Sequence, residues 1–318
     1  MKSNFDFLNR YWPALAQIGA TAENYVYSDP NACVYKLGMF AERLVQEILV
    51  FEHIAEPVND NTHANRIRIL KRAGLLPHEI DNTLYILRKT RNSAVHAGTD
   101  SVDEAKTLLS LTYNLAVWFM ETYGDWGYIA LEFVMPVEIT HEGLESVIAE
   151  QEKKIVELTK QLAVVKTAAS GKTQKERAKR SESVSAMMNW NEAQTRCLID
   201  EQLRLSGWDT QNLRYSKGTR PVKGRNLVIS EWPTNSAFST KGYADYAFFV
   251  GEKLVAVMEA KKVSEDVAST IDVQVKDYAA HIKTEDLPYT VGNWNGYQVP
   301  FLFASNGRAY LEQLRTKS

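Results

Sequence analysis

Apolar residues recur three or four positions apart through residues 1–135, which is the period of amphipathic helices. Helix-start signals precede these runs: Asp29-Pro30, Leu76-Pro77 and a capping box from Ser101 to Glu104. The run after Asp29-Pro30 comprises Leu37, Phe40, Ala41, Leu44, Ile48 and Leu49. We therefore predict an amino-terminal helical bundle that ends at Met135-Pro136.

A second helical pattern occupies residues 136–190. Its apolar positions follow a heptad-like spacing and are Leu144, Ile148, Ile155, Leu158, Leu162 and Val165. They predict one long amphipathic helix, which either forms a short coiled coil or packs on the bundle. A basic run from Lys172 to Arg180 comes next. We expect it to be a solvated linker, with contact to a DNA backbone as the alternative.

At residue 191 the pattern changes from all-helical to α/β. A helix is expected over Asn191–Ser206, with Gly207 at its carboxyl-terminal cap. Short apolar runs between turn signals then predict a sheet. Its strands are expected around Leu227–Ile229, Tyr243–Val250, Leu254–Lys261 and Pro300–Ala304, with a helix near Glu265–Ile282. The predicted fold class is α+β overall: a helical bundle (1–135), a linker helix and basic linker (136–190), and an α/β domain (191–318).

Composition narrows the class of protein. The chain has 318 residues, of which 45% are hydrophobic and 24% charged, which is typical of a folded soluble protein with room for two cores. Its net charge of −2 gives no global nucleic-acid signature, so any contact with DNA must come from local basic patches. The two cysteines, Cys33 and Cys197, and the lack of a signal-peptide core or membrane-length apolar run indicate a cytoplasmic protein without membrane contact.

Acidic and basic side chains gather at the ends of two predicted strands. Asp245 lies near the start of one strand, and Glu259-Ala260-Lys261 ends the next. Charged groups at the end of an apolar strand are expensive to desolvate unless they are paired or bind something. A salt-bridged hairpin is one explanation. The other is metal-dependent phosphodiester cleavage, in which two carboxylates hold Mg²⁺ and a lysine steadies developing charge.

The register of this hairpin decides between the two explanations. A two-residue turn at Gly251-Glu252 without any irregularity would set Asp245 opposite Met258, and Glu259 would face the other side of the sheet. A three-residue turn, or a β-bulge between the turn and the carboxylates, would set Asp245 opposite Glu259 instead. We predict one of these two arrangements, with the two carboxylates and the carbonyl of Ala260 as metal ligands.

The stretch resembles the core of PD-(D/E)xK nucleases, with Gly242–Asp245 and Glu259–Lys261 as its motifs. Gln274 and Tyr278 add a Gln-x-x-x-Tyr motif similar to the RecB-like branch and to the motor (R) subunits of type I restriction enzymes. Further segments similar to those subunits are Glu192–Trp208, Arg214–Gly218, Ser230–Pro233 and Phe301–Arg308. The resemblance implies a restriction-endonuclease-like domain with a mixed sheet over residues 191–318.

The same resemblance implies a function and a site. Asp245, Glu259 and Lys261 would cleave double-stranded DNA with Mg²⁺, and Glu192, Gln274 and Tyr278 would support them. The chain would be the amino-terminal part of an R subunit that joins methyltransferase and specificity subunits. An ATP-driven motor is expected beyond Ser318. A non-catalytic docking module for those subunits is the alternative function.

Two basic motifs stay open at this point. Lys217, Arg220, Lys223 and Arg225 lie in a loop broken by Gly and Pro, which could follow a DNA backbone or could be an ordinary exposed turn. Arg91-Asn-Ser-Ala-Val-His96 resembles the motif of HEPN helical domains, some of which are ribonucleases that use this Arg and His. We expect a structural or docking role for Arg91 and His96, with a HEPN-type ribonuclease as the alternative.

Overall fold

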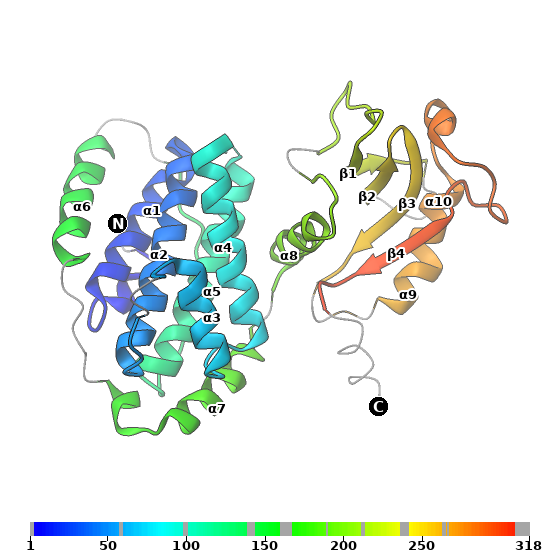
Figure 1. Cartoon of the computed structure of the whole chain (residues 1–318). Helices are drawn as coiled ribbons and strands as arrows, with labels where there is room; N and C mark the ends of the chain where they lie inside the picture. The colour runs from blue at the N-terminus through cyan, green and yellow to red at the C-terminus, as the bar shows by residue number, and fades with distance from the viewer. Residues whose placement is uncertain are drawn as a thin grey trace. The chain divides into compact units, whose positions relative to one another are not determined.

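The computed structural model of the protein forms two compact units, Met1–Met188 and Asn189–Ser318 (Figure 1). The described residues are 3–56, 60–97, 101–138, 144–159, 167–188, 190–210, 214–235, 242–262, 265 and 267–308. Within these ranges no helix has both the length and the apolar character needed to cross a membrane.

The first unit is a helical bundle, as predicted. Its helices are α1 (Pro13–Ser28), α2 (Pro30–Phe51), α3 (His63–Arg72), α4 (His78–Ala97), α5 (Val102–Phe119), α6 (Leu144–Thr159) and α7 (Gln174–Ser185). Short turns of other helix types lie at Asp6–Leu8, Met120–Gly124 and Ala168–Gly171. Two of the three predicted start signals act as caps: the side chain of Asp29 accepts from the amide of Ala32 (2.9 Å), and Ser101 accepts from that of Glu104 (3.2 Å).

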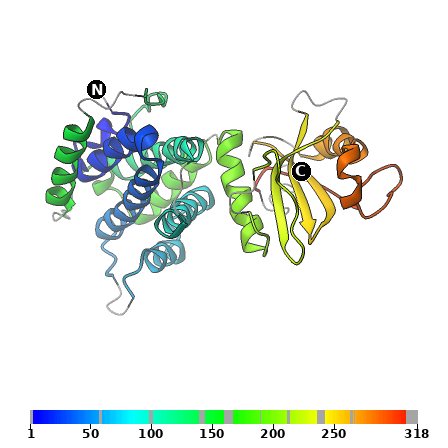
Figure 2. The same ribbon diagram turned by 90° about the horizontal axis from the view of Figure 1, so that it is seen from above.

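Helix α6 packs on the bundle, which was the second of its two interpretations. It lies beside α1 in both views (Figures 1 and 2). Asn24 of α1 donates to Gln151 at 2.8 Å, and Lys36 of α2 forms an ion pair with Glu152 at 2.6 Å. Polar contacts to two different helices therefore fix α6 on the bundle.

The basic run differs from its prediction as a solvated linker. It begins helix α7, which Thr173 and Glu176 cap reciprocally. Arg177 is buried, and its Nε donates to Glu52, the residue at the carboxyl-terminal cap of α2, at 2.8 Å. A guanidinium group can be buried in a helical core when it pairs with a buried carboxylate. This segment is therefore part of the first unit.

The second unit is built on a four-stranded mixed sheet in the order β1-β2-β3-β4, which confirms the α+β prediction. Strands β1, β2 and β3 pair antiparallel, and β4 runs parallel to β3. The strands are β1 (Asn226–Pro233), β2 (Tyr243–Val250), β3 (Lys253–Ala260) and β4 (Phe301–Ser305). The helices are α8 (Glu192–Leu205), α9 (Ala268–Thr270), a π-helical turn (Ile271–Val275), α10 (Lys276–Ala280) and a 3₁₀ turn (Thr284–Tyr289).

Alternating side chains give the sheet two apolar faces. Helix α8 covers one face and α10 the other, as Figures 1 and 2 show from two directions. On the α8 face, Ile199 packs with Val228, Tyr246 and Met258. The core on the α10 face contains Ile229, Trp232, Ala247, Phe249, Val257 and Tyr278. Both faces are buried, which explains why β2 and β3 read as nearly continuous apolar runs.

Candidate active site

The β2–β3 hairpin has the register that brings the two predicted carboxylates together. Its turn has two residues, because Val250 pairs with Lys253. A bulge follows, in which Phe249 pairs with Leu254 but Phe248 pairs with Ala256, so Val255 is the extra residue. Beyond the bulge Tyr246 pairs with Met258, and continuing this register sets Asp245 opposite Glu259. The bulge that we predicted from the needs of a shared site is therefore present.

Asp245 and Glu259 are both fully buried at the end of the sheet. One oxygen of Asp245 accepts from the backbone amide of Ala260 at 2.8 Å. One oxygen of Glu259 lies 2.9 Å from Nζ of Lys261, and this lysine keeps 18% of its side chain exposed. On its other side β3 stays paired with β4 as far as Ala260. The two predicted carboxylate ligands and Lys261 thus all lie beside Ala260.

Two charged residues that the sequence interpretation did not select belong to this cluster. Arg196 of α8 contacts both Asp245 and Glu192, the latter at 3.0 Å. Its other terminal nitrogen lies 4.0 Å from Glu231 of β1. The spacing of Glu192 and Arg196 by four on one helix was a signal that could have found the arginine. Glu231 lies in the Ser230–Pro233 segment. Its backbone φ of 57° departs from the strand conformation, so the alternation of side chains along β1 does not predict where its side chain points.

The electrostatics of Arg196 follow from its buried surroundings. Burial by itself lowers the pKa of this guanidinium, but the charges of Asp245 and Glu192 more than reverse that effect and the pKa is raised. Arg196 is therefore a permanent cation beside a buried carboxylate. Glu192 takes part in the cluster through Arg196.

Gln274 and Tyr278 lie on the helical segment that covers the α10 face of the sheet, opposite to α8. Gln274 is half-buried in the π-helical turn, and Tyr278 is fully buried in the core of that face. Single π-helical turns occur frequently at functional sites. The supporting roles of both residues stay predictions.

The basic loop runs along β1, away from the carboxylates. Tyr215 pairs with Ser230 near the site, whereas the amide of Gly251 at the hairpin turn donates to Arg225 at 2.8 Å. Five residues of β2 separate that turn from Asp245, which at about 3.4 Å per residue is about 17 Å. The four predicted DNA-binding residues, Lys217, Arg220, Lys223 and Arg225, are exposed, and Arg225 pairs with Asp209. The structure thus leaves Lys223 and Arg225 far from the carboxylates.

Metal ligands in this unit would have to come from few side chains. The part of the chain that the structure describes contains no group of three or more His, Cys, Asp or Glu residues able to hold a metal ion. Asp245 and Glu259 are two such residues, and the carbonyl of Ala260 adds a backbone oxygen. This set suits a cation that keeps several waters.

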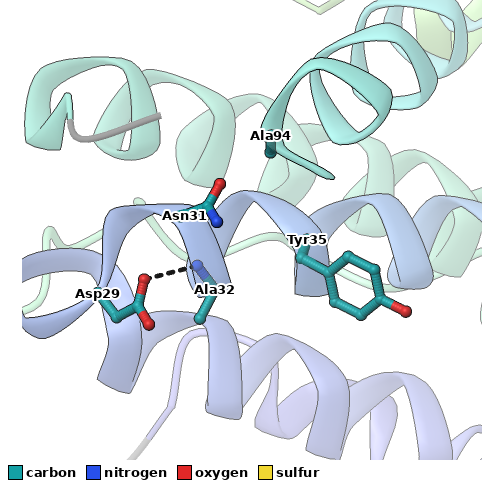
Figure 3. Close-up of a pocket in the computed structure, with 5 residues that line it drawn as sticks. All are labelled: Asp29, Asn31, Ala32, Tyr35 and Ala94. Carbon is teal, nitrogen blue, oxygen red and sulfur yellow. Dashed lines mark hydrogen bonds between the residues drawn. The ribbon is translucent and has the colours of Figure 1, made fainter. Parts of the chain in front are cut away.

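The HEPN-like motif of the first unit is tied into a network between helices. Arg91 pairs with Glu42 of α2 at 2.6 Å and lies over the ring of Tyr35. The side chain of His96 is outside the described residues. Tyr35 also borders a pocket of ≈ 180 Å³ at the start of α2 (Figure 3). The lining residues are Asp29, Asn31, Ala32, Tyr35 and Ala94.

Comparison with known proteins shows what each unit is similar to. Residues 207–318 match the family described as the second domain of the type I restriction enzyme EcoKI endonuclease subunit. Residues 20–161 match a family described as a domain of unknown function, DUF4145. The chain is therefore similar to the endonuclease (R) subunit of a type I restriction enzyme, in agreement with the resemblance of its motifs.

A particular relative is the type I restriction enzyme EcoKI endonuclease subunit of Escherichia coli (strain K12). It is 28% identical to this chain over 397 aligned residues. The alignment covers 100% of the chain and 33% of the relative, so the chain spans about a third of that protein's length. No solved structure matches the chain.

Proposed function

We propose that the second unit is the DNA-cleaving domain of a type I restriction enzyme, and that it cuts double-stranded DNA with Mg²⁺. The observation that supports this most is the bulged register of the β2–β3 hairpin, which sets Asp245 against Glu259. A salt-bridged surface hairpin would explain exposed charges. It does not explain why two fully buried carboxylates are set opposite each other, where their like charges repel unless cations balance both.

The residues present fit Mg²⁺. The carboxylates of Asp245 and Glu259 would hold the ion together with the carbonyl of Ala260. The N–H and C=O of one strand residue point to the same side, and the N–H of Ala260 points to Asp245, so its carbonyl faces that side as well. The bound ion would supply Lewis-acid polarisation of the scissile phosphate and a water of lowered pKa.

Lys261 has the position of a group that stabilises charge during cleavage. Its ammonium lies 2.9 Å from Glu259, and 18% of its side chain is exposed. It can therefore donate to a phosphate oxygen that approaches from solvent while it stays beside the carboxylate. Gln274 and Tyr278 would position this lysine or nearby DNA, and Glu192 would act through Arg196.

The relationship to type I enzymes suggests the partners. The chain would assemble with methyltransferase and specificity subunits, which choose the DNA site, while ATP would be used by a separate motor region. The exposed loop with Lys217, Arg220 and Lys223 offers cations to a DNA backbone along β1, where phosphate contacts position a duplex without reading its sequence.

Cleavage by single-residue variants tests the proposal. In the assembled enzyme, with Mg²⁺ and ATP, we expect Glu259→Gln and Lys261→Ala to slow plasmid nicking by about a hundredfold or more, since each removes stabilisation of the transition state. Matched controls are Glu252→Gln at the exposed hairpin turn and Lys262→Ala at the exposed next position, both with wild-type rates expected.

Other outcomes separate the alternatives. Nicking by the Glu259 and Lys261 variants within about threefold of wild type would show that these roles are wrong, because one electrostatic stabiliser is worth far more. Loss of subunit assembly with no change in cleavage per assembled enzyme would favour the docking module. RNA cleavage that disappears in His96→Ala would favour the HEPN-type ribonuclease.

A further inference from the structure

We infer that Arg196 is a built-in counter-ion of the metal site: its guanidinium balances Asp245 while no metal is bound and turns to Glu192 and Glu231 when a divalent cation binds. This inference rests on the proposed function and adds a regulation of metal binding to it. It makes Arg196 a positioning residue that competes with the metal.

The geometry shows one guanidinium at the meeting point of three carboxylates from three elements. Nη2 of Arg196 contacts Oδ1 of Asp245 in β2 and lies 3.0 Å from Oε1 of Glu192 in α8. Nη1 lies 4.0 Å from Oε1 of Glu231 in β1. Arg196 thus already contacts a second acceptor, Glu192, and the third carboxylate lies within ion-pair distance, so a small rotation of its side chain can exchange one partner for another.

The three acceptors differ in how much they depend on Arg196. The side chain of Asp245 is 0% exposed, whereas Glu192 and Glu231 keep 39% and 23% exposure. Water solvates the two glutamates in part, and Arg214 also pairs with Glu231 at 2.6 Å. An ionised Asp245 instead needs a cation close by, because burial of an uncompensated carboxylate is strongly unfavourable. Arg196 meets that need in the metal-free protein.

A divalent cation on Asp245 and a guanidinium on the same carboxylate repel each other. In a buried site this repulsion is weakly screened, so binding of the cation favours the rotamer of Arg196 that faces Glu192 and Glu231. Nε of Arg196 is buried and has no hydrogen-bond partner in the described structure, so a change of rotamer breaks no bond of this atom.

Binding of Mn²⁺ to the full chain, measured by titration calorimetry without DNA, tests the inference. We expect Arg196→Met to bind Mn²⁺ at least about tenfold more tightly than wild type, since the metal no longer displaces a cation, and tenfold corresponds to about 1.4 kcal/mol. We expect its melting temperature to fall in EDTA and to rise with Mn²⁺ by more than that of wild type. The matched control is Arg204→Met on the same helix, where the arginine pairs with Glu201 at 2.8 Å.

The measurements distinguish failure of the counter-ion role from failure of the nuclease proposal. Equal or weaker Mn²⁺ binding by Arg196→Met overturns the counter-ion role, while the proposed nuclease site stands if Asp245→Asn abolishes binding. Absence of saturable Mn²⁺ binding in wild type overturns the nuclease proposal itself. Should Arg196→Met not fold without metal, Arg196→Met/Asp245→Asn removes the stranded charge. Recovery of cooperative unfolding in that double variant supports the coupling, and no recovery overturns it.

Discussion

At the residue scale, several buried charged side chains are paired with partners from another element. In the first unit Glu42 of α2 bridges Arg66 of α3 at 3.0 Å and Arg91 of α4 at 2.6 Å. His63 lies at the start of α3 beside this network, and both its ring nitrogens are buried without a hydrogen-bond partner in the described structure. A neutral imidazole tolerates that position, whereas a protonated one would be desolvated among guanidinium groups.

Acid should therefore destabilise the first unit through His63. Burial lowers the pKa of this imidazole from 6.5 to about 4, with Glu42 opposing and Arg88, Arg91 and Arg66 adding to the effect. Because the folded pKa is the lower one, the stability that His63 contributes is complete above about pH 6.5 and is lost as the pH falls toward 4. Between pH 7 and pH 5 we expect wild type to lose about 2 kcal/mol more unfolding free energy than His63→Leu.

Urea denaturation of the first unit, followed at several pH values, measures this difference. Parallel pH profiles for the two proteins would show that His63 does not titrate in this window. A larger loss in the variant than in wild type would contradict the sign of the effect.

At the element scale, the β2–β3 hairpin sets the register of the site by two features. The first is Gly251, which has a φ of 59° at the first position of the two-residue turn. A glycine at that position is typical of type II′ turns, whose twist matches that of the strands. The second is the bulge at Val255, which moves every later residue of β3 along by one.

Alanine at Gly251 should destabilise the second unit. An L-residue in this left-handed conformation costs about 1–2 kcal/mol, while the added Cβ meets no steric clash, its nearest neighbour being 3.7 Å away. We expect Gly251→Ala to reduce the unfolding free energy by that amount, with unchanged Mn²⁺ affinity because the register is kept.

Gly171→Ala is the control, since Gly171 has no positive φ and open space around it. Loss of Mn²⁺ binding in the Gly251 variant would show that the turn, rather than the packing of the two sheet faces, maintains the register.

At the scale of the whole molecule, the chain has two units with separate cores and the first extends to residue 188. Its last helix, α7, completes the bundle. The side chain of Arg177 pairs with Glu52, which is 1% exposed, and Trp118 of α5 donates to Ser181 at 3.1 Å. The bundle therefore needs residues well beyond Met135-Pro136.

The stability of two fragments, residues 1–188 and residues 1–135, should show that the first unit extends beyond residue 135. We expect residues 1–188 to unfold cooperatively alone. Residues 1–135 should be less stable by about 3–5 kcal/mol, because the fragment loses the packing of α7 and the buried Arg177–Glu52 ion pair. Circular dichroism during urea denaturation measures both fragments. In the full chain, Arg177→Met should show a similar loss and exposed Lys175→Met should not; equal stability of the fragments would contradict the role of α7.

The sequence by itself determined the local elements and the catalytic candidates. Helix starts at Asp29-Pro30 and Ser101, and strands around Tyr243–Val250 and Leu254–Lys261, were predictable because caps, turns and apolar periods act within a few residues. Asp245 and Glu259 stood out for the same reason, as charges that border apolar strands.

Tertiary structure decided which of these charges meet. Leu254 and Val255 are both apolar, so the sequence does not indicate which of them is the extra residue; packing of the two sheet faces selects Val255. Arg177 lies in a run expected to be a solvated linker, and Arg196 lies on a predicted helix. Their carboxylate partners, Glu52 and Asp245, lie 125 and 49 positions away. Such pairs form where folding brings distant segments together in a buried interior. Local sequence patterns therefore do not predict them.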